Sequence, residues 1–204
     1  DQLKPSLDLF ADIVRNPAFR DADISRLRGQ WLAGIAQEKS QPTGIALRTL
    51  PPLLYGEGHA YAIPFTGSGT EASIKSLTPV DMRAFIGDYI RPDNVKILVA
   101  GDTTMGRIIP QLNAAFGNWK APAGKVPAKN IGKVAPPSQV RVYLVDRPGA
   151  QQSLILAGSL APPTTAPNDL EIQTMNGAFG GTFTSRLNMN LREDKHWAYG
   201  AFSF

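Results

Sequence analysis

The chain has 204 residues, of which 43% are hydrophobic and 19% are charged, a composition typical of globular domains and sufficient for one large or two small ones. No run approaches the roughly 18 apolar residues of a transmembrane helix, so no membrane span is predicted. The sequence contains no cysteine, which excludes disulfides and thiolate metal sites.

The basic charge of the chain is confined to one segment. The net charge is +4, and four lysines without any acidic neighbour lie between Trp119 and Gln139. They are Lys120, Lys125, Lys129 and Lys133. The rest of the chain is therefore neutral, and we expect no nucleic-acid partner, since such proteins carry a basic patch or stripe on a folded face.

The first half of the sequence predicts four helices and one strand. After a loose start, apolar residues at helical spacing indicate helices at 21–38, 42–54, 79–89 and 105–116, with Pro51 and Pro52 disturbing the second. Thr78 followed by Pro79 is a typical helix start. Residues 56–69 read as a loop, and 95–100 as a buried strand.

The second half has a different rhythm. Residues 140–145 and 152–157 alternate as antiparallel strands do, and helices follow near Pro167 and after the glycines at 177–181. The second of these helices carries Phe183, Leu187 and Leu191 on one face. A final alternating strand, 198–204, is expected to point Phe202 and Phe204 into the core and Tyr199 to the open face.

This pattern predicts an α+β fold in two parts. We expect residues 1–118 to be the end of one domain, 119–138 to be a linker rich in proline and lysine, and 139–204 to begin a second domain. A single strand in the first half makes no sheet. We therefore interpret the chain as an excerpt of a longer protein.

Few residues in this chain are suited to chemistry. The two histidines, His59 and His196, stand in no H-x-x-E-H or H-E-x-x-H pattern, and no serine stands in G-x-S-x-G. His59 reads as a packing or turn element. Arg192, at a helix end, and Tyr199, at the next strand's start, are the remaining pair. Either they pack structurally, or Arg192 holds a carboxylate or carbonyl while Tyr199 stabilises an oxyanion.

Several runs, in order along the chain, resemble the pitrilysin/insulinase family of zinc peptidases in its bacterial, processing-peptidase-like branch. The first are Leu77-Thr-Pro-Val-Asp81, Tyr89-Ile-Arg-Pro-Asp-Asn94 and Val99-Ala-Gly-Asp102. The others are Asp146-Arg-Pro-Gly-Ala-Gln-Gln-Ser153, Phe179-Gly-Gly-Thr-Phe-Thr-Ser-Arg-Leu187 and Leu191-Arg-Glu-Asp-Lys-His-Trp-Ala-Tyr-Gly200.

The resemblance implies two similar α+β domains that enclose a chamber, each with helices on one face of a sheet. One domain binds zinc through H-x-x-E-H and a glutamate on a later helix. The other supplies an arginine and a tyrosine, which match Arg192 and Tyr199, to bind the peptide and stabilise the transition state. His196-Trp197 departs from the small-residue pair usual before that tyrosine.

The helix at 21–38 resembles the family helix that carries the zinc-binding glutamate, and Gly34 stands where the resemblance places that glutamate. The resemblance therefore implies a chain without a metal or cofactor of its own, inactive alone. Its partners would be a peptide substrate and a zinc-bearing H-x-x-E-H subunit in a hetero-oligomer. Two alternatives stay open, a structural scaffold member and a self-sufficient peptidase with an unusual metal site. The sequence leaves the compartment undetermined, and a periplasmic or cell-envelope location is the working hypothesis.

Overall fold

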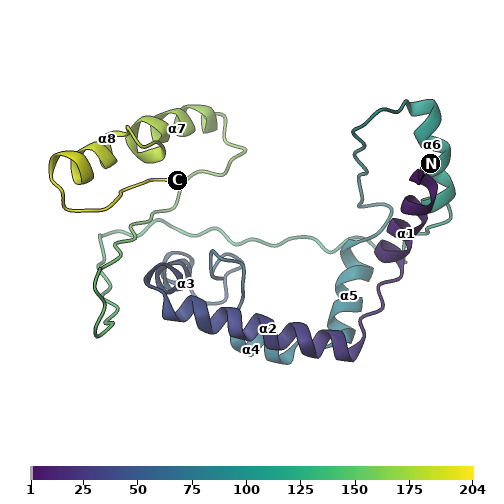
Figure 1. The fold of residues 1–204 in the computed structure, drawn as a ribbon, viewed down its shortest axis with the longest axis horizontal. Helices are drawn as coiled ribbons and strands as arrows, with labels where there is room; N and C mark the ends of the chain where they lie inside the picture. The colour runs from purple at the N-terminus through teal and green to yellow at the C-terminus, as the bar shows by residue number, and fades with distance from the viewer. Residues whose placement is uncertain (1) are drawn as a thin grey trace. The chain divides into compact units, whose positions relative to one another are not determined.

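The computed structural model describes residues 2–204, and Figure 1 shows their helices along the chain. They divide into two units, Asp1–Gly158 and Ser159–Phe204, each with its own internal packing. The first unit holds six α-helices, α1 (Leu3–Arg15), α2 (Asp21–Ser40), α3 (Pro42–Tyr55), α4 (Glu71–Ser76), α5 (Pro79–Tyr89) and α6 (Met105–Phe116). The second holds α7 (Asp169–Asn176), the π-helical turn η1 (Gly177–Gly181), α8 (Arg186–Asn188) and the π-helical turn η2 (Met189–Asp194).

The predicted α+β fold is wrong for the part of the chain that the structure describes. Its regular elements are all helical, and residues 2–204 form no strand or sheet. Segments 95–100, 140–145, 152–157 and 198–204 were all expected as strands. A strand requires a neighbour that accepts and donates backbone hydrogen bonds, and these segments have no such ladder within residues 2–204.

Side-chain exposure in these segments agrees with the missing sheet. Val140, Val142 and Leu144 are 93, 91 and 94% exposed, whereas Tyr143 and Val145 are near half. The alternation that predicted a strand is thus present as a pattern of exposure. Alternating apolar residues indicate that a segment favours an extended backbone, but they do not show that a neighbouring strand is present.

The helices of the first unit follow the sequence signals closely. Thr78 and Asp81 form a reciprocal capping box at the start of α5, in which the Thr78 backbone N–H donates to the Asp81 carboxylate at 2.8 Å. Hydrogen bonds from Thr78 lower the pKa of Asp81. The helices expected around 21–38, 79–89 and 105–116 are confirmed as α2, α5 and α6.

Helix α3 continues through Pro51 and Pro52 instead of breaking there. Pro51 has no N–H, so the carbonyl of Leu47 lacks its usual partner one turn ahead. The N–H of Phe65, in the loop after α3, donates to that carbonyl at 3.0 Å. The Leu47 carbonyl that Pro51 leaves free therefore connects the 56–69 loop to α3.

The start of the chain is a helix and not a loose segment. Leu7, Ala11 and Val14 lie on one face of α1, which packs against α6. Phe10 meets Phe116 edge to face at 6.0 Å between ring centroids. Arg15 donates to the carbonyl of Ala115 at 2.8 Å, which satisfies one end of α6.

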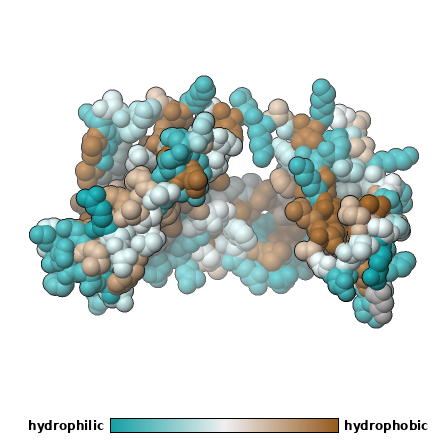
Figure 2. Space-filling model, turned by 90° about the horizontal axis from the view of Figure 1, so that it is seen from above, coloured by the Kyte–Doolittle hydropathy of each residue, from teal (hydrophilic) through white to brown (hydrophobic). Residues whose placement is uncertain are grey.

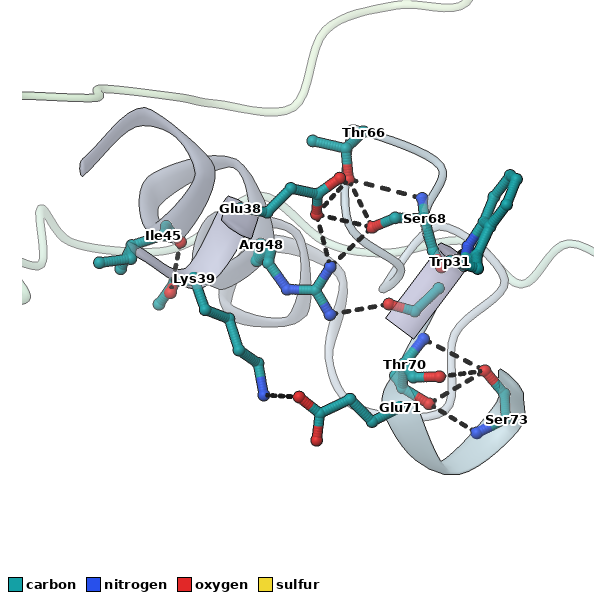
Figure 3. A network of polar contacts seen from close by, with 12 residues as sticks. Trp31, Glu38, Lys39, Ile45, Arg48, Thr66, Ser68, Thr70, Glu71 and Ser73 are labelled. Atoms are coloured by element: carbon teal, nitrogen blue, oxygen red, sulfur yellow. Dashed lines mark hydrogen bonds and ion pairs between the residues drawn. The ribbon is translucent and has the colours of Figure 1, made fainter. Parts of the chain in front are cut away.

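A network of polar side chains joins α2, α3 and the loop before α4, as Figure 3 shows. One carboxylate oxygen of Glu38 accepts from Arg48 and Ser68, each at 2.7 Å. Arg48, whose side chain is 11% exposed, also donates to the Gly69 carbonyl at 2.8 Å. Desolvation alone raises the pKa of Glu38, but hydrogen bonds from Ser68, Arg48 and Thr66 outweigh it and lower that pKa.

Within the first unit, two side chains hold the segment expected as a linker, 119–138, to residues that precede it in the chain. Arg91, 3% exposed, donates to the carbonyls of Pro122 at 3.0 Å and Gly124 at 2.8 Å and pairs with Asp93. His59 contacts the Gly132 carbonyl at 2.9 Å. The segment has no regular secondary structure, yet it is fastened at two points.

Much apolar surface lies open, as the brown regions of Figure 2 show. Fully or nearly buried apolar side chains are few among the described residues and include Ile24, Ile35 and Ile108. Within residues 2–204 no helix has both the length and the apolar character to cross a bilayer.

Candidate functional site

The backbone after α8 brings the two predicted site residues together within the second unit. Arg192 lies on η2, where the wider turn lets the N–H of Lys195 donate to the Asn190 carbonyl at 3.0 Å. The N–H groups of Trp197 and Ala198 then both donate to the carbonyl of Leu191. These two hydrogen bonds reverse the chain direction, so that Tyr199 lies beside η2.

Arg192 lies between charged and aromatic neighbours. The central carbon of its guanidinium is 4.9 Å from the ring centroid of Phe183 and 5.3 Å from that of Tyr199. Its Nε is 3.2 Å from a carboxylate oxygen of Glu193, and the side chain is 34% exposed. Within residues 2–204 the guanidinium donates no geometrically sound hydrogen bond. Its N–H fork is therefore open to an external acceptor.

Tyr199 presents its phenol to the outside. The residue is 88% exposed, and its hydroxyl has no hydrogen-bond partner in the described part of the chain. Its ring nevertheless lies against the Arg192 guanidinium. The two predicted residues are therefore neighbours in space, one a charged and the other a neutral hydrogen-bond donor.

Asn188 ties together the two segments that flank this pair, and the sequence did not single it out. It is fully buried, its amide nitrogen donates to the Phe183 carbonyl at 2.8 Å, and its amide oxygen accepts from the Ala201 N–H at 3.1 Å. An amide among the apolar residues Leu187 and Met189 was the available signal. A buried amide needs hydrogen-bond partners for both its nitrogen and its oxygen.

Gly180 admits the end of the chain at close range. The Ser203 N–H donates to the Gly180 carbonyl at 3.0 Å, and a Cβ on Gly180 would overlap the Ser203 hydroxyl and lie 2.7 Å from its backbone nitrogen. Gly180 thus serves close packing, whereas a Cβ at Gly177 would meet no atom within 4 Å.

The predicted facing of the last segment is wrong for its aromatic residues. Phe202 and Phe204 are 62 and 95% exposed, whereas Ala201 and Ser203 turn their backbone toward Asn188 and Gly180. Hydrogen bonds to the helical turns, and not apolar alternation, set this segment's orientation.

His196 and Trp197, which replace the pair of small residues usual before the tyrosine, form an irregular turn in the structure. His196 adopts a left-handed backbone conformation, with φ of 55°, in the turn between η2 and Tyr199. Trp197 is 77% exposed, with the Lys195 ammonium 5.9 Å from its ring. Histidine is one of the residues that tolerate this conformation better than most.

Potential metal ligands are scattered over the part of the chain that the structure describes. No group of three or more His, Asp or Glu side chains within residues 2–204 is arranged to hold a metal ion. Gly34 lies on the exposed side of α2 with open space around it. His59 is a packing element, stacked on Tyr55 at 5.2 Å, and its Nδ1 accepts from the Tyr61 N–H at 3.0 Å.

Residues 76–204, more than half of the chain, match the family model of the peptidase M16 inactive domain. An uncharacterized zinc protease of Streptomyces coelicolor is 26% identical over 202 residues, 98% of this chain and 43% of the relative. A corresponding protein of Bacillus subtilis is also 26% identical, over 98% of this chain and 46% of its own length.

Solved structures give the same result. The chain is 25% identical to a crystal structure of a peptidase M16 inactive domain from Pseudomonas fluorescens, with a TM-score of 0.77 over 98% of this chain and 47% of that one. A protease from Helicobacter pylori shares the fold, with a TM-score of 0.75 at 18% identity over 100% of this chain and 48% of its own. The chain thus spans less than half the length of these relatives. The predicted resemblance to zinc peptidases is confirmed, and the chain belongs to the peptidase M16 inactive-domain family.

Proposed function

We propose that this chain is the peptide-binding, non-zinc part of a zinc metallopeptidase assembly. The observation that carries the proposal is the open Arg192 guanidinium beside the exposed Tyr199 hydroxyl. Arg192 would hold a carboxylate or carbonyl of the peptide through its N–H fork. Tyr199 would donate a hydrogen bond to the oxyanion that forms at the scissile carbonyl.

Peptide binding and water activation would take place at two different sites. A guanidinium fork fits the oxygen pair of a carboxylate or the lone pairs of a carbonyl, and it keeps its charge at any working pH. A neutral phenol stabilises negative charge that develops only in the transition state. Neither group activates water, so hydrolysis needs a metal centre elsewhere.

We assign that centre to a partner subunit with an H-x-x-E-H motif. The family description of an inactive domain supports this assignment. At Gly34 the chain also lacks the side chain that would complete a zinc site. Zinc bound by the partner would supply the nucleophilic water, while this chain's residues bind and orient the peptide.

The test reconstitutes the full-length protein with its zinc-bearing partner and follows cleavage of an internally quenched 20-residue peptide. Tyr199→Phe should lower kcat about a hundredfold, as loss of one oxyanion donor does. Arg192→Ala should lower kcat/KM at least about tenfold, since a hydrogen bond to a charged group is lost.

Matched controls are Arg186→Ala and Tyr143→Phe. Arg186 is exposed on α8, in the same unit as the site, and Tyr143 lies in the other unit. Both controls should leave turnover within about twofold, as surface changes away from a site do. Full activity in Arg192→Ala and Tyr199→Phe would disprove the site assignment.

A scaffold role is the second candidate, and one observation favours it. Arg192 has a carboxylate neighbour in Glu193 and two aromatic rings, contacts that a purely structural side chain would also make. A scaffold would assemble with its partner, as size-exclusion chromatography would show, and the same variants would leave turnover unchanged.

A further inference from the structure

We propose that Phe183 is a positioning residue that holds the Arg192 guanidinium in its peptide-binding orientation. This inference rests on the proposed function of Arg192. Phe183 was expected on the apolar face of a helix, together with Leu187 and Leu191. The structure instead places it in the turn before α8, 52% exposed, with its ring under a guanidinium.

The contact of Phe183 with Arg192 is the shorter of the two aromatic contacts. The guanidinium carbon is 4.9 Å from the Phe183 centroid and 5.3 Å from the Tyr199 centroid. Both distances are within the range at which a ring's electron-rich face attracts a cation. Phe183 is half-exposed and adds little to a core, and its ring contacts the Arg192 guanidinium.

The backbone that carries Phe183 is held by the same buried amide that holds the segment after Tyr199. Asn188 donates to the Phe183 carbonyl and accepts from the Ala201 N–H. One side chain therefore connects the backbone of Phe183 to the segment that follows Tyr199. The backbone segments that carry the two rings are held near one another by the hydrogen bonds of this fully buried side chain.

Two aromatic neighbours restrict an otherwise flexible side chain. A free arginine has many rotamers, and fixing them on binding costs conformational entropy. The rings of Phe183 and Tyr199 contact the guanidinium and Glu193 lies beside its Nε, so the two Nη groups remain for a ligand. A peptide oxygen must then approach the Nη groups, where its lone pairs meet the N–H donors. Phe183 prepares Arg192 for binding without contacting the peptide itself.

The experiment compares Phe183→Leu, which removes the ring, with Phe183→Tyr, which retains it, in the full-length protein. Phe202→Leu is the matched control, since Phe202 is an exposed aromatic of the same unit. The first readout is the Arg192 Nε–Hε NMR signal of the free protein, which ring currents displace from its ordinary position. The second is the dissociation constant of a fluorescein-labelled, unstructured 20-residue peptide.

We expect Phe183→Leu to return the Nε–Hε signal toward that of an ordinary arginine and to weaken peptide binding about two- to fivefold, the size of an exposed cation–π contact. Phe183→Tyr should preserve both values, and so should Phe202→Leu. A signal and an affinity unchanged in Phe183→Leu would overturn the positioning role.

The two proposals fail in distinguishable ways. If Phe183→Leu moves the NMR signal but Arg192→Ala binds the peptide as well as the wild type, positioning stands and the proposed function of Arg192 is wrong. If Arg192→Ala loses peptide binding while Phe183→Leu changes neither readout, the function stands and positioning is wrong.

Discussion

At the scale of single residues, the backbone of Ser203 packs directly against Gly180, with its N–H bonded to the Gly180 carbonyl. Any Cβ at Gly180 meets the Ser203 hydroxyl and backbone nitrogen. We expect Gly180→Ala to lower the free energy of unfolding by about 1–3 kcal/mol, the usual cost of overpacking. Chemical denaturation of the variant and the wild type measures this difference.

Gly177→Ala is the control for that measurement. A Cβ there meets no atom within 4 Å, and the backbone is right-handed, with φ of −55°. Alanine should therefore be neutral or stabilise the protein by up to about 1 kcal/mol. Equal effects of the two substitutions would show that the close approach of Ser203 to Gly180 is absent in solution.

The residues of the site differ in how far the sequence could reveal them. Arg192 and Tyr199 were predicted as a pair by their positions at a helix end and the following segment, and they lie together. Their connection through Asn188 was not predicted, because it depends on two hydrogen bonds across the turn. Phe202 was assigned to the core from alternation alone, which says nothing about which face of a segment meets a neighbour.

At the scale of elements, the Glu38–Arg48 network makes the packing of α2 on α3 sensitive to acid. Glu38 has a lowered pKa in the folded protein, so its ionised form favours folding. This stabilisation is fully present above the ordinary pKa of 4.5 and is lost as the pH falls through the lower, folded value. Glu71, Asp81 and Asp93 also have lowered pKa values and act in the same direction.

Glu38→Gln tests this contribution. We expect the variant to be less stable by about 1–2 kcal/mol at pH 7, since hydrogen bonds to a charged group are lost at a partly exposed site. The difference from the wild type should shrink below pH 4.5 as Glu38 itself becomes protonated. Thermal unfolding from pH 7 to pH 3 measures it, with the exposed Glu57→Gln as control. A difference that stays constant with pH would contradict the network.

Helices could be predicted where residues within the helix mark its start, and they were missed or misjudged where a distant residue stabilises the helix. Thr78, Pro79 and Asp81 mark the start of α5 within the sequence itself. Helix α1 was not predicted, and its segment contains Pro5. A proline in the first turn of a helix breaks no helical hydrogen bond, so Pro5 is compatible with α1. The continuity of α3 through Pro51 depends on the distant Phe65 N–H, which no local pattern indicates.

At the scale of the whole molecule, the predicted sheet is the largest error, and its cause is general. Helices satisfy their backbone groups internally, whereas strands depend on a neighbour elsewhere in the chain or assembly. The segments at 95–100 and 140–145 have the composition of strands but no hydrogen-bonded neighbour within residues 2–204. The family could still be identified, because its signature lies in ordered short motifs and not in the sheet.

The absence of backbone partners has a direct consequence for amide exchange in the chain of residues 1–204. Amides at 95–100, 140–145 and 152–157 should exchange with deuterium near the rate of an unstructured peptide, because no carbonyl among residues 2–204 accepts a hydrogen bond from them. Amides in α2, whose Ile35 is fully buried, should exchange far more slowly. Exchange followed by mass spectrometry of peptic fragments compares the two sets within one sample. If 140–145 were protected as well as α2, those residues would be hydrogen-bonded in solution, and the helical description of this chain would be wrong.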